Sequence, residues 1–406
     1  MNKNIKVLSI LLIGGLSFSS CKKEVSSSNS SSSLEDASTG GIYEEQSKKD
    51  VQNTANKMMD RLEGVNELES VNTSLNFLSL ISKNNDSDPN MDPITPMALI
   101  KSVADFGTTN STKNVENTLK RGTSSDNSLS NFNDARGEYV WNGKEFVKST
   151  SKQIIYRFPS KEGRGNDACY SINFEEQKSN SILPEGLSPA LVDAKLTVSG
   201  KVLMQYTFKS SYDQQGMPTF VQSKLFINPF SFSQTMSATN ANLTQDYSFE
   251  KSGEVLVGMG MSMKGNFTSN NVKAIIGSEN ATSDDNLNKS ISTIDAHFQL
   301  LDLIIKGSLD VAGASKVSNL NNATDDVDKL NSFYKFGLFY TTNGKKIADL
   351  QFYKSDKNDP QIRLLFADKS KVDIDTFMKG FEKLTDDFNK RLEKALGKEE
   401  KETELP

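Results

Sequence analysis

Apolar and polar residues alternate with a period of two between Ala190 and Phe267. A β-strand with one buried face requires such alternation, because successive side chains point to opposite sides of the sheet. Turn residues at positions 199–200 and 213–216 separate the runs, and Pro229 ends another because proline cannot donate to a strand ladder. The apolar faces predicted in this way are Val192, Ala194, Leu196 and Val198; Val202, Met204, Tyr206 and Phe208; Val221, Ser223, Leu225 and Ile227; Phe230, Phe232, Gln234 and Met236; and Val255, Val257, Met259, Met261 and Met263. Consecutive hairpins of this kind predict an antiparallel meander.

Further strands are predicted on both sides of this central stretch. Asn142-Gly143 and Asn343-Gly344 each stand between two alternating runs, and Asn-Gly favours the tight turn of a β-hairpin. Other runs with strand character cover residues 153–158, 168–175, 291–311 and 361–367. In the run 291–311 the apolar positions change parity near Leu300–Leu301, which predicts a β-bulge there. Gly258 and Gly260 lie inside a strand pattern, where glycine marks curvature or a close approach.

Two segments have the helical spacing of apolar residues, one near each end of the chain. From Glu44 to Lys83 apolar residues recur every three or four positions, which predicts one long helix, or two in series with a break at Gly64. This stripe suits packing on the protein's own sheet or a coiled-coil seam with a partner. The same spacing from Asp373 to Leu396 predicts a terminal amphipathic helix. The expected fold class is therefore α+β: a large, curved antiparallel β-sheet, or an unclosed barrel, with long N- and C-terminal helices packed on it.

The N-terminus has the pattern of a secretory signal. Lys3 and Lys6 precede the apolar run Val7–Leu16, and Phe18-Ser-Ser-Cys21 follows. This pattern resembles a bacterial lipoprotein signal, although the residue three before the cysteine is usually Leu and here is Phe18. The resemblance implies that Cys21 carries lipid, including palmitate, and anchors the chain in the cell outer membrane. The leaflet stays open, and the alternative is a plain secreted protein.

These signals divide the chain into consecutive parts. The predicted parts are a signal peptide (1–20), a lipidated Ser-rich tether (21–43), a helical segment (44–134), an antiparallel sheet region (135–320), a helix–hairpin–strand–helix segment that completes the same domain (321–397) and a charged tail (398–406). The tether has too few apolar residues to order itself, and about 20 flexible residues span roughly 25 Å.

Charge and composition exclude some classes of binding partner. The formal charge is −5 and no basic stripe is present, which argues against nucleic acid. No apolar stretch approaches the length of about 18 residues that a spanning helix needs. The chain has two cysteines, so a lipid on Cys21 leaves Cys169 without a disulfide partner. Cys169 lies in an alternating run and is expected to be a small apolar strand residue rather than a nucleophile.

The sequence contains little that indicates catalysis. The single histidine, His297, has no Ser or Cys motif beside it, which argues against a His-based triad or a multi-His metal site. Residues 86–92 space oxygen ligands like the start of a calcium loop but lack its glycine and its glutamate. No cofactor, no metal and no enzymatic activity are expected, while paired-carboxylate hydrolysis stays open because the chain has 52 acidic residues.

The closest feature to a binding site is one stripe of the central stretch. Its residues are Val255, Val257, Met259, Met261 and Met263. Methionine is adaptable and polarizable, and it suits a promiscuous apolar surface. The stripe is either an ordinary sheet core covered by a helix or the lining of a concavity for an acyl chain or another apolar ligand.

Several turn and strand signatures resemble a family of Bacteroidota lipoproteins. They are Leu183–Leu187, Leu196–Lys201, Ser211–Asp213, Gly216–Thr219 and Asn228–Phe230, and the resemblance covers roughly residues 138–367. It implies no catalytic residues. At the level of shape the many hairpins with helices also resemble the unclosed barrels of LolA/LolB-type lipoprotein carriers. The expected function is a membrane-anchored envelope lipoprotein with a non-catalytic binding or structural role, whose partner is an envelope protein or an apolar ligand. The alternatives are a lipid carrier and, third, a hydrolase.

Overall fold

The computed structural model describes nine parts of the chain. They are residues 42–61, 68–83, 96, 135–175, 190–213, 218–267, 291–315, 327–354 and 360–374. The signal segment, Cys21, the Ser-rich tether and nearly all of the predicted C-terminal helix lie outside them.

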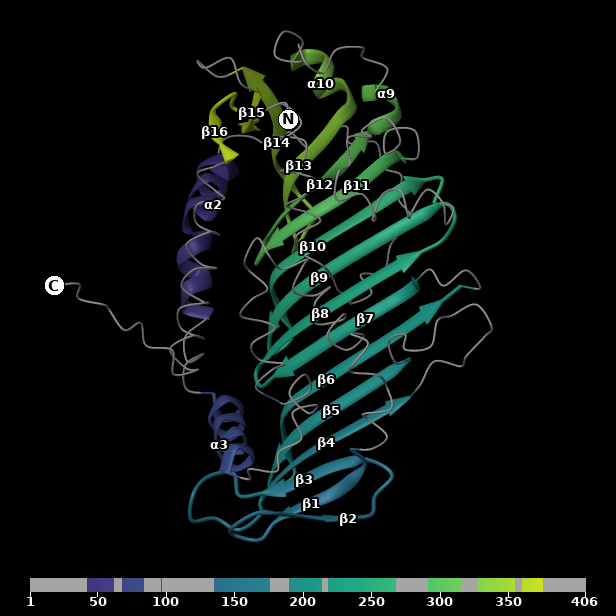
Figure 1. Cartoon of the computed structure of the whole chain (residues 1–406). Helices are drawn as coiled ribbons and strands as arrows, with labels where there is room; N and C mark the ends of the chain where they lie inside the picture. The colour runs from purple at the N-terminus through teal and green to yellow at the C-terminus, as the bar shows by residue number, and fades with distance from the viewer. Residues whose placement is uncertain are drawn as a thin grey trace, which may run out of the picture. The chain divides into compact units, whose positions relative to one another are not determined.

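The strands form one mostly antiparallel sheet of 16 strands that is not closed (Figure 1). The strands are β1 (Gly137–Trp141), β2 (Phe146–Ser149), β3 (Ile154–Phe158), β4 (Ala168–Glu175), β5 (Leu191–Val198), β6 (Lys201–Tyr212), β7 (Pro218–Ile227), β8 (Phe230–Ala238), β9 (Asn242–Lys251), β10 (Glu254–Gly265), β11 (Ile291–Leu300), β12 (Leu303–Asp310), β13 (Tyr334–Tyr340), β14 (Lys346–Lys354), β15 (Pro360–Phe366) and β16 (Lys371–Asp373). From β16 down to β3 each strand lies beside its neighbour in the sequence, and β1 then pairs with β3 in parallel and with β2 in antiparallel orientation. The predicted meander is therefore confirmed.

The helices are short, so the described residues form a mainly β fold rather than the expected α+β fold. They are α2 (Ile42–Arg61), α3 (Glu69–Lys83), α9 (Val311–Ser315) and α10 (Val327–Phe333). Of the two predictions for the N-terminal segment, one long helix is wrong and two helices in series are confirmed. Helix α2 ends at Arg61 and α3 begins at Glu69, on either side of Gly64. No long terminal helix is present within the described ranges, which end at Ile374 near the start of the predicted C-terminal helix.

The central strands confirm the predicted alternation most directly at β5. Val192, Ala194, Leu196 and Val198 are all buried, and the residues between them are half-buried. Ser199 and Gly200 form the turn to β6 with φ angles of 47° and 79°. Both central residues of a type I′ hairpin turn need such positive angles.

The alternation was misjudged where the pairing slips by one residue. Leu196 pairs with Met204 but Thr197 with Val202, so Leu203 is an extra residue and is buried together with Met204. Leu256 is a second extra residue, and it is fully buried between Val255 and Val257. A bulge places two consecutive side chains outside the strict alternation.

Two other predictions were wrong in detail. The parity change near Leu300–Leu301 is no bulge but a two-residue hairpin turn, because Leu300 pairs with Leu303 and Leu301 has a φ of 50°. In β8 the predicted face also changes, since Ser233 and Thr235 are buried whereas Phe232 is half-buried. Small hydroxyl side chains give no apolar signal in the sequence, so their burial could not be predicted from it.

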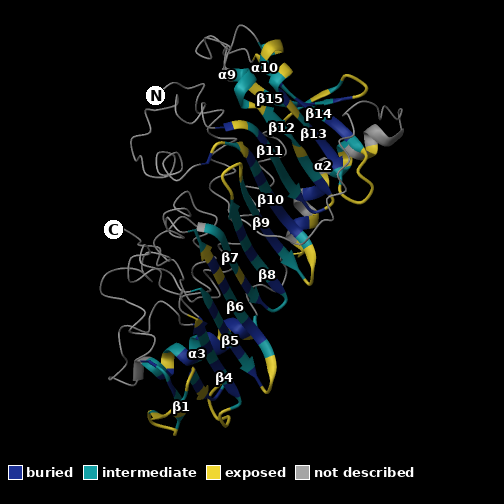
Figure 2. Cartoon of the chain, turned by 90° about the vertical axis from the view of Figure 1, so that its right-hand side faces the viewer, coloured by how far each residue is buried: buried dark blue, intermediate teal, exposed yellow. Residues whose placement is uncertain are grey.

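The chain divides into two compact units. Unit 1 comprises residues 1–61, 217–220 and 233–383, and unit 2 comprises residues 62–216, 221–232 and 384–406. In unit 2 the core lies between α3 and the strands, and Phe77 of α3 is surrounded by Tyr156, Phe158 and Tyr170. In unit 1 buried residues extend along β9–β15 (Figure 2).

Candidate functional site

The predicted apolar stripe lies along β10 in unit 1. Val257, Met259, Met261 and Met263 are buried, and Val255 before the bulge is half-buried. The structure therefore brings four of the five residues onto one buried face. Ligand binding on this face stays a prediction.

The far end of the stripe is part of an apolar cluster. Met261 and Met263 pack there with buried aromatic and aliphatic side chains of the same unit. The other members are Phe267, Ile291 and Ile294, with Leu243, Leu309 and Val311 at the margin. Methionine side chains adapt to irregular surroundings, so this cluster can change its packing more readily than one made of β-branched residues.

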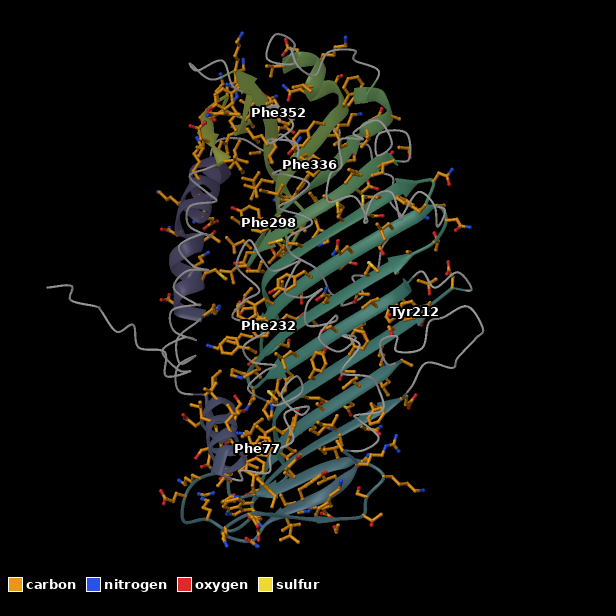
Figure 3. All side chains as sticks on the ribbon, in the orientation of Figure 1. Phe77, Tyr212, Phe232, Phe298, Phe336 and Phe352 are labelled. Carbon is orange, nitrogen blue, oxygen red and sulfur yellow. The ribbon has the colours of Figure 1, made fainter. Side chains whose placement is uncertain are left out.

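The near end of the stripe belongs to a row of side chains that crosses unit 1. Residues directly opposite each other on neighbouring strands point to the same face of a sheet. Through the pairing of β9 to β15 the row on the face of Met259 runs Tyr247, Met259, Phe298, Ile305, Leu338, Ala348 and Phe366. Phe298 is labelled in Figure 3. The row is apolar throughout except for one phenol.

Helix α2 crosses this apolar face. Near its N-terminus Lys48 forms an ion pair with Asp368 at 2.5 Å and lies 5.2 Å from the ring centre of Phe366. The Tyr340 hydroxyl, on the same face as Val257, donates to the Asp50 carboxylate at 2.9 Å. A helix of 20 residues is about 30 Å long, which suffices to cross six strands spaced about 4.8 Å apart.

The C-terminal end of α2 is also held by polar groups. Arg61 pairs with Glu254 at 3.0 Å, and the Lys251 ammonium donates to the Arg61 carbonyl at 2.7 Å. A cation at the last carbonyls of a helix is attracted by the partial negative charge of the C-terminal end and stabilises the helix. Among the described side chains of α2, Thr54 and Met58 are buried, and the Thr54 hydroxyl donates to the Asp50 carbonyl of its own helix. Sequence patterning gave the stripe of α2 but no indication of these polar contacts.

Polar side chains are concentrated on part of the opposite face of unit 1. Two neighbouring rows of paired residues show this. The first row is Asp246, Gly260, His297, Lys306, Gly337 and Asp349, and the second is Thr244, Ser262, Asp295, Ser308 and Lys335. Lys264 and Asp295 form an ion pair at 2.9 Å on this face. The sheet of unit 1 therefore has an apolar face and a face with two polar rows, whose next row includes Ile304 and the buried Phe339.

His297 occupies the space that Gly260 leaves open. A Cβ atom on Gly260 would lie 2.5 Å from Asp246 Oδ1 and 2.9 Å from His297 Nδ1, so both side chains lean over the glycine. This confirms the close approach predicted for this glycine. Burial lowers the pKa of His297, the Asp246 carboxylate opposes that shift, and Lys306 adds to it. The imidazole is therefore neutral at pH 7.

The polar row does not assemble a recognisable catalytic or metal site in the part of the chain that the structure describes. No group of three or more His, Cys, Asp or Glu side chains is placed there to hold a metal ion. The side chains of His297 and Asp246 both lie over Gly260, and among the described residues no nucleophile is identified beside them, as a hydrolytic triad would need.

Cys169 lies on β4 in unit 2, half-buried and with a free thiol. Its neighbours across the strands are Arg157 on β3 and Thr197 on β5. Burial raises the pKa of the Cys169 thiol, although the Arg157 charge opposes that shift. A protonated thiol is a poor nucleophile, so this environment fits the predicted structural role. Cys21, the predicted lipidation site, lies outside the described residues.

Comparison with known proteins finds no relative. No protein-family model, no curated protein and no solved structure matches this chain. Within the described residues, no helix combines the length and the apolar character needed to cross a membrane.

Proposed function

We propose that this protein is a lipid-anchored protein of the cell envelope with a non-catalytic binding role. The anchor is a lipid on Cys21, and the outer membrane is its location. The support is the order of residues at the N-terminus, with Lys3 and Lys6 before an apolar run and small residues directly before the cysteine. The membrane is thus the first partner, reached through the lipid.

One observation carries the binding role. The sheet of unit 1 has two unlike faces, an apolar one that α2 crosses and a polar one with paired charges. Broad faces of this kind contact partners over many strands without a catalytic group. An envelope protein is the partner that suits the polar face, because its charges are balanced between acids and bases.

The anchor is tested with the two cysteines of the chain. The full-length protein is expressed in a diderm host in the presence of radioactive palmitate, and membranes are then separated from soluble protein. The wild-type protein and the Cys169→Ala control should take up label and sediment with the membranes. Cys21→Ala should lose the label and become soluble. A Cys21→Ala protein that stays in the membrane fraction contradicts the proposed anchor.

A second candidate function is the binding of an apolar ligand along the stripe on β10. Met259 lies within a row of apolar side chains that spans seven strands, and polar contacts hold the helix above it. Native mass spectrometry of the full-length protein should show a bound mass of a few hundred daltons that Met261→Glu removes and the Met261→Leu control keeps. A wild-type protein without a bound mass contradicts this candidate and leaves the anchor untouched.

A further inference from the structure

We propose that α2 is a displaceable cover, and that the apolar face beneath it binds an acyl chain of a membrane lipid. This inference rests on the second candidate function, because it names the ligand class and the element that controls access. The site is the row from Tyr247 to Phe366 together with Val257, Leu300 and Leu303, all within unit 1.

The face beneath α2 has the chemistry of an acyl-chain site. Its surface is built from aliphatic, aromatic and thioether side chains, of which Phe298 and Ile305 are half-buried rather than buried. Across seven strands the row extends about 29 Å. One leaflet of a bilayer core is about 15 Å thick, so a single acyl chain fits along the row with space to spare.

The contacts of α2 are of a kind that can be exchanged. At the C-terminal end the ion pair joins Arg61 and Glu254 side chains that are 50% and 47% exposed. Ion pairs at such exposure contribute little to stability because water screens them. Thr54 uses its hydroxyl within the helix, and so it loses no partner when the helix moves away. Among the described side chains of α2, Met58 is the buried apolar one, and an acyl chain can replace its contacts.

The position of α2 in the chain links its displacement to the membrane. The helix begins at Ile42, and the Ser-rich tether of residues 21–43 connects it to the proposed lipid on Cys21. Along the chain, α2 is therefore the described element nearest to the proposed anchor.

The test uses full-length protein reconstituted in vesicles of phosphatidylethanolamine and phosphatidylglycerol. A small share of the phosphatidylethanolamine carries a photoactivatable group on its acyl chain. The protein is produced without this probe, so its own anchor cannot cross-link. After irradiation the cross-linked peptides are mapped by mass spectrometry, and hydrogen exchange of residues 42–61 reports the state of α2.

Four variants separate the cover from the site. The charge-reversed variant carries Lys48→Glu and Arg61→Glu, which repel Asp368 and Glu254. It should raise hydrogen exchange in α2 severalfold, and cross-linking within residues 254–265 should rise severalfold as well. Adding Asp368→Lys and Glu254→Arg restores both attractions and should return both signals to the wild-type level. Met259→Glu should reduce cross-linking to background, whereas Met259→Leu should keep it.

Two results overturn the inference. One is cross-linking confined to residues 1–41, which would mean contact with the bilayer alone. The other is equal cross-linking of residues 254–265 in the wild-type, charge-reversed and charge-restored proteins. If Cys21 takes up palmitate and either result is obtained, the anchored binding function stands and the acyl-chain site fails.

Discussion

The two helices α2 and α3 follow each other in the sequence, yet they are held in contrasting ways. In unit 2, α3 inserts Phe77 among aromatic rings, with ring centres 4.6 Å from Phe158 and 5.2 Å from Tyr156. Figure 3 shows Phe77 beside the strands of unit 2. In unit 1, α2 is joined to the strands by ion pairs at Lys48 and Arg61. Unit 2 thus uses its helix as core, whereas in unit 1 ion pairs near both ends of α2 accompany the buried Met58.

The sequences of the two helices explain this difference. In α2 the charged residues outnumber the apolar ones, whereas α3 has charged residues only at its two ends. Apolar burial is the main source of stability in a small unit, and exposed ion pairs contribute little. A helix with more charged than apolar residues should therefore cost less to remove, as the proposed displacement of α2 requires.

The largest effect is expected from Phe77→Ala in unit 2. Removing a fully buried aromatic side chain leaves a cavity among Tyr156, Phe158 and Tyr170, and it should destabilise unit 2 by about 3–5 kcal/mol. Chemical denaturation measures the loss, and hydrogen exchange should place it in β3–β6 as well as in α3. Phe77→Leu, which keeps most of the volume, is the control and should lose less. A loss confined to α3 would mean that this helix too is only a cover.

A smaller and more local effect is expected from Met58→Ala in α2. Met58 is fully buried, so its truncation should cost about 2–3 kcal/mol. If α2 is the proposed displaceable cover, exchange should rise in residues 42–61 while β9–β13 keep their protection. Lys57→Ala, at an exposed neighbour, serves as the control for helix propensity. Loss of protection in β9–β13 would contradict the contrast between the two helices.

The polar face of unit 1 provides a third test at Gly260. In Gly260→Ala the new methyl group would meet the side chains of His297 and Asp246, which must then move, at a cost of about 1–3 kcal/mol. Gly258→Ala on the same strand is the control, since its nearest atoms are 3.4 Å away and allow an ordinary contact. Thermal unfolding compares the two variants. If the two variants are equally stable, the side chains of His297 and Asp246 do not need the space that Gly260 leaves open.

The sequence predicted the strands correctly where apolar and polar residues alternate regularly, and less well where the alternation is interrupted. Alternation at Val192–Val198 identified a strand, its buried face and its turn, because one face of β5 is buried along its whole length. The burial of Leu203 and Leu256 was not predicted, because a bulge leaves no mark when both neighbouring residues are apolar. At Leu301 a change of parity had two explanations, and the sequence does not distinguish a bulge from a turn with a leucine at positive φ.

The candidate site was predicted in part. Apolar residues at every second position placed Met259, Met261 and Met263 on one face, as the structure shows. The row that crosses β9–β15 depends on the registers of six strand pairs, and pairing between distant strands is not encoded in any one of them. The partners of Lys48 and Arg61 lie 320 and 193 residues away, so no local pattern could have indicated them.

The smallest effect is expected in the pH dependence of stability. It should be confined to unit 1, which holds the only histidine of the chain. The pKa of His297 in the folded protein is below its ordinary value of 6.5, because burial disfavours the charged imidazole. Well above pH 6.5 both states carry a neutral imidazole. As the pH falls below that value the unfolded chain takes up the proton first, so the stability of unit 1 should decrease toward the folded pKa.

Two substitutions make this measurement specific. His297→Gln should remove the decrease in stability between pH 7 and the folded pKa, as followed by chemical denaturation. Asp246→Asn removes the carboxylate that opposes the shift, so the pKa of His297 should fall further and the decrease should extend to lower pH. Nuclear magnetic resonance of the single labelled imidazole measures that pKa directly. An imidazole that titrates above 6.5 would mean that Asp246, rather than burial, dominates its surroundings, and that unit 1 gains stability from the protonated form.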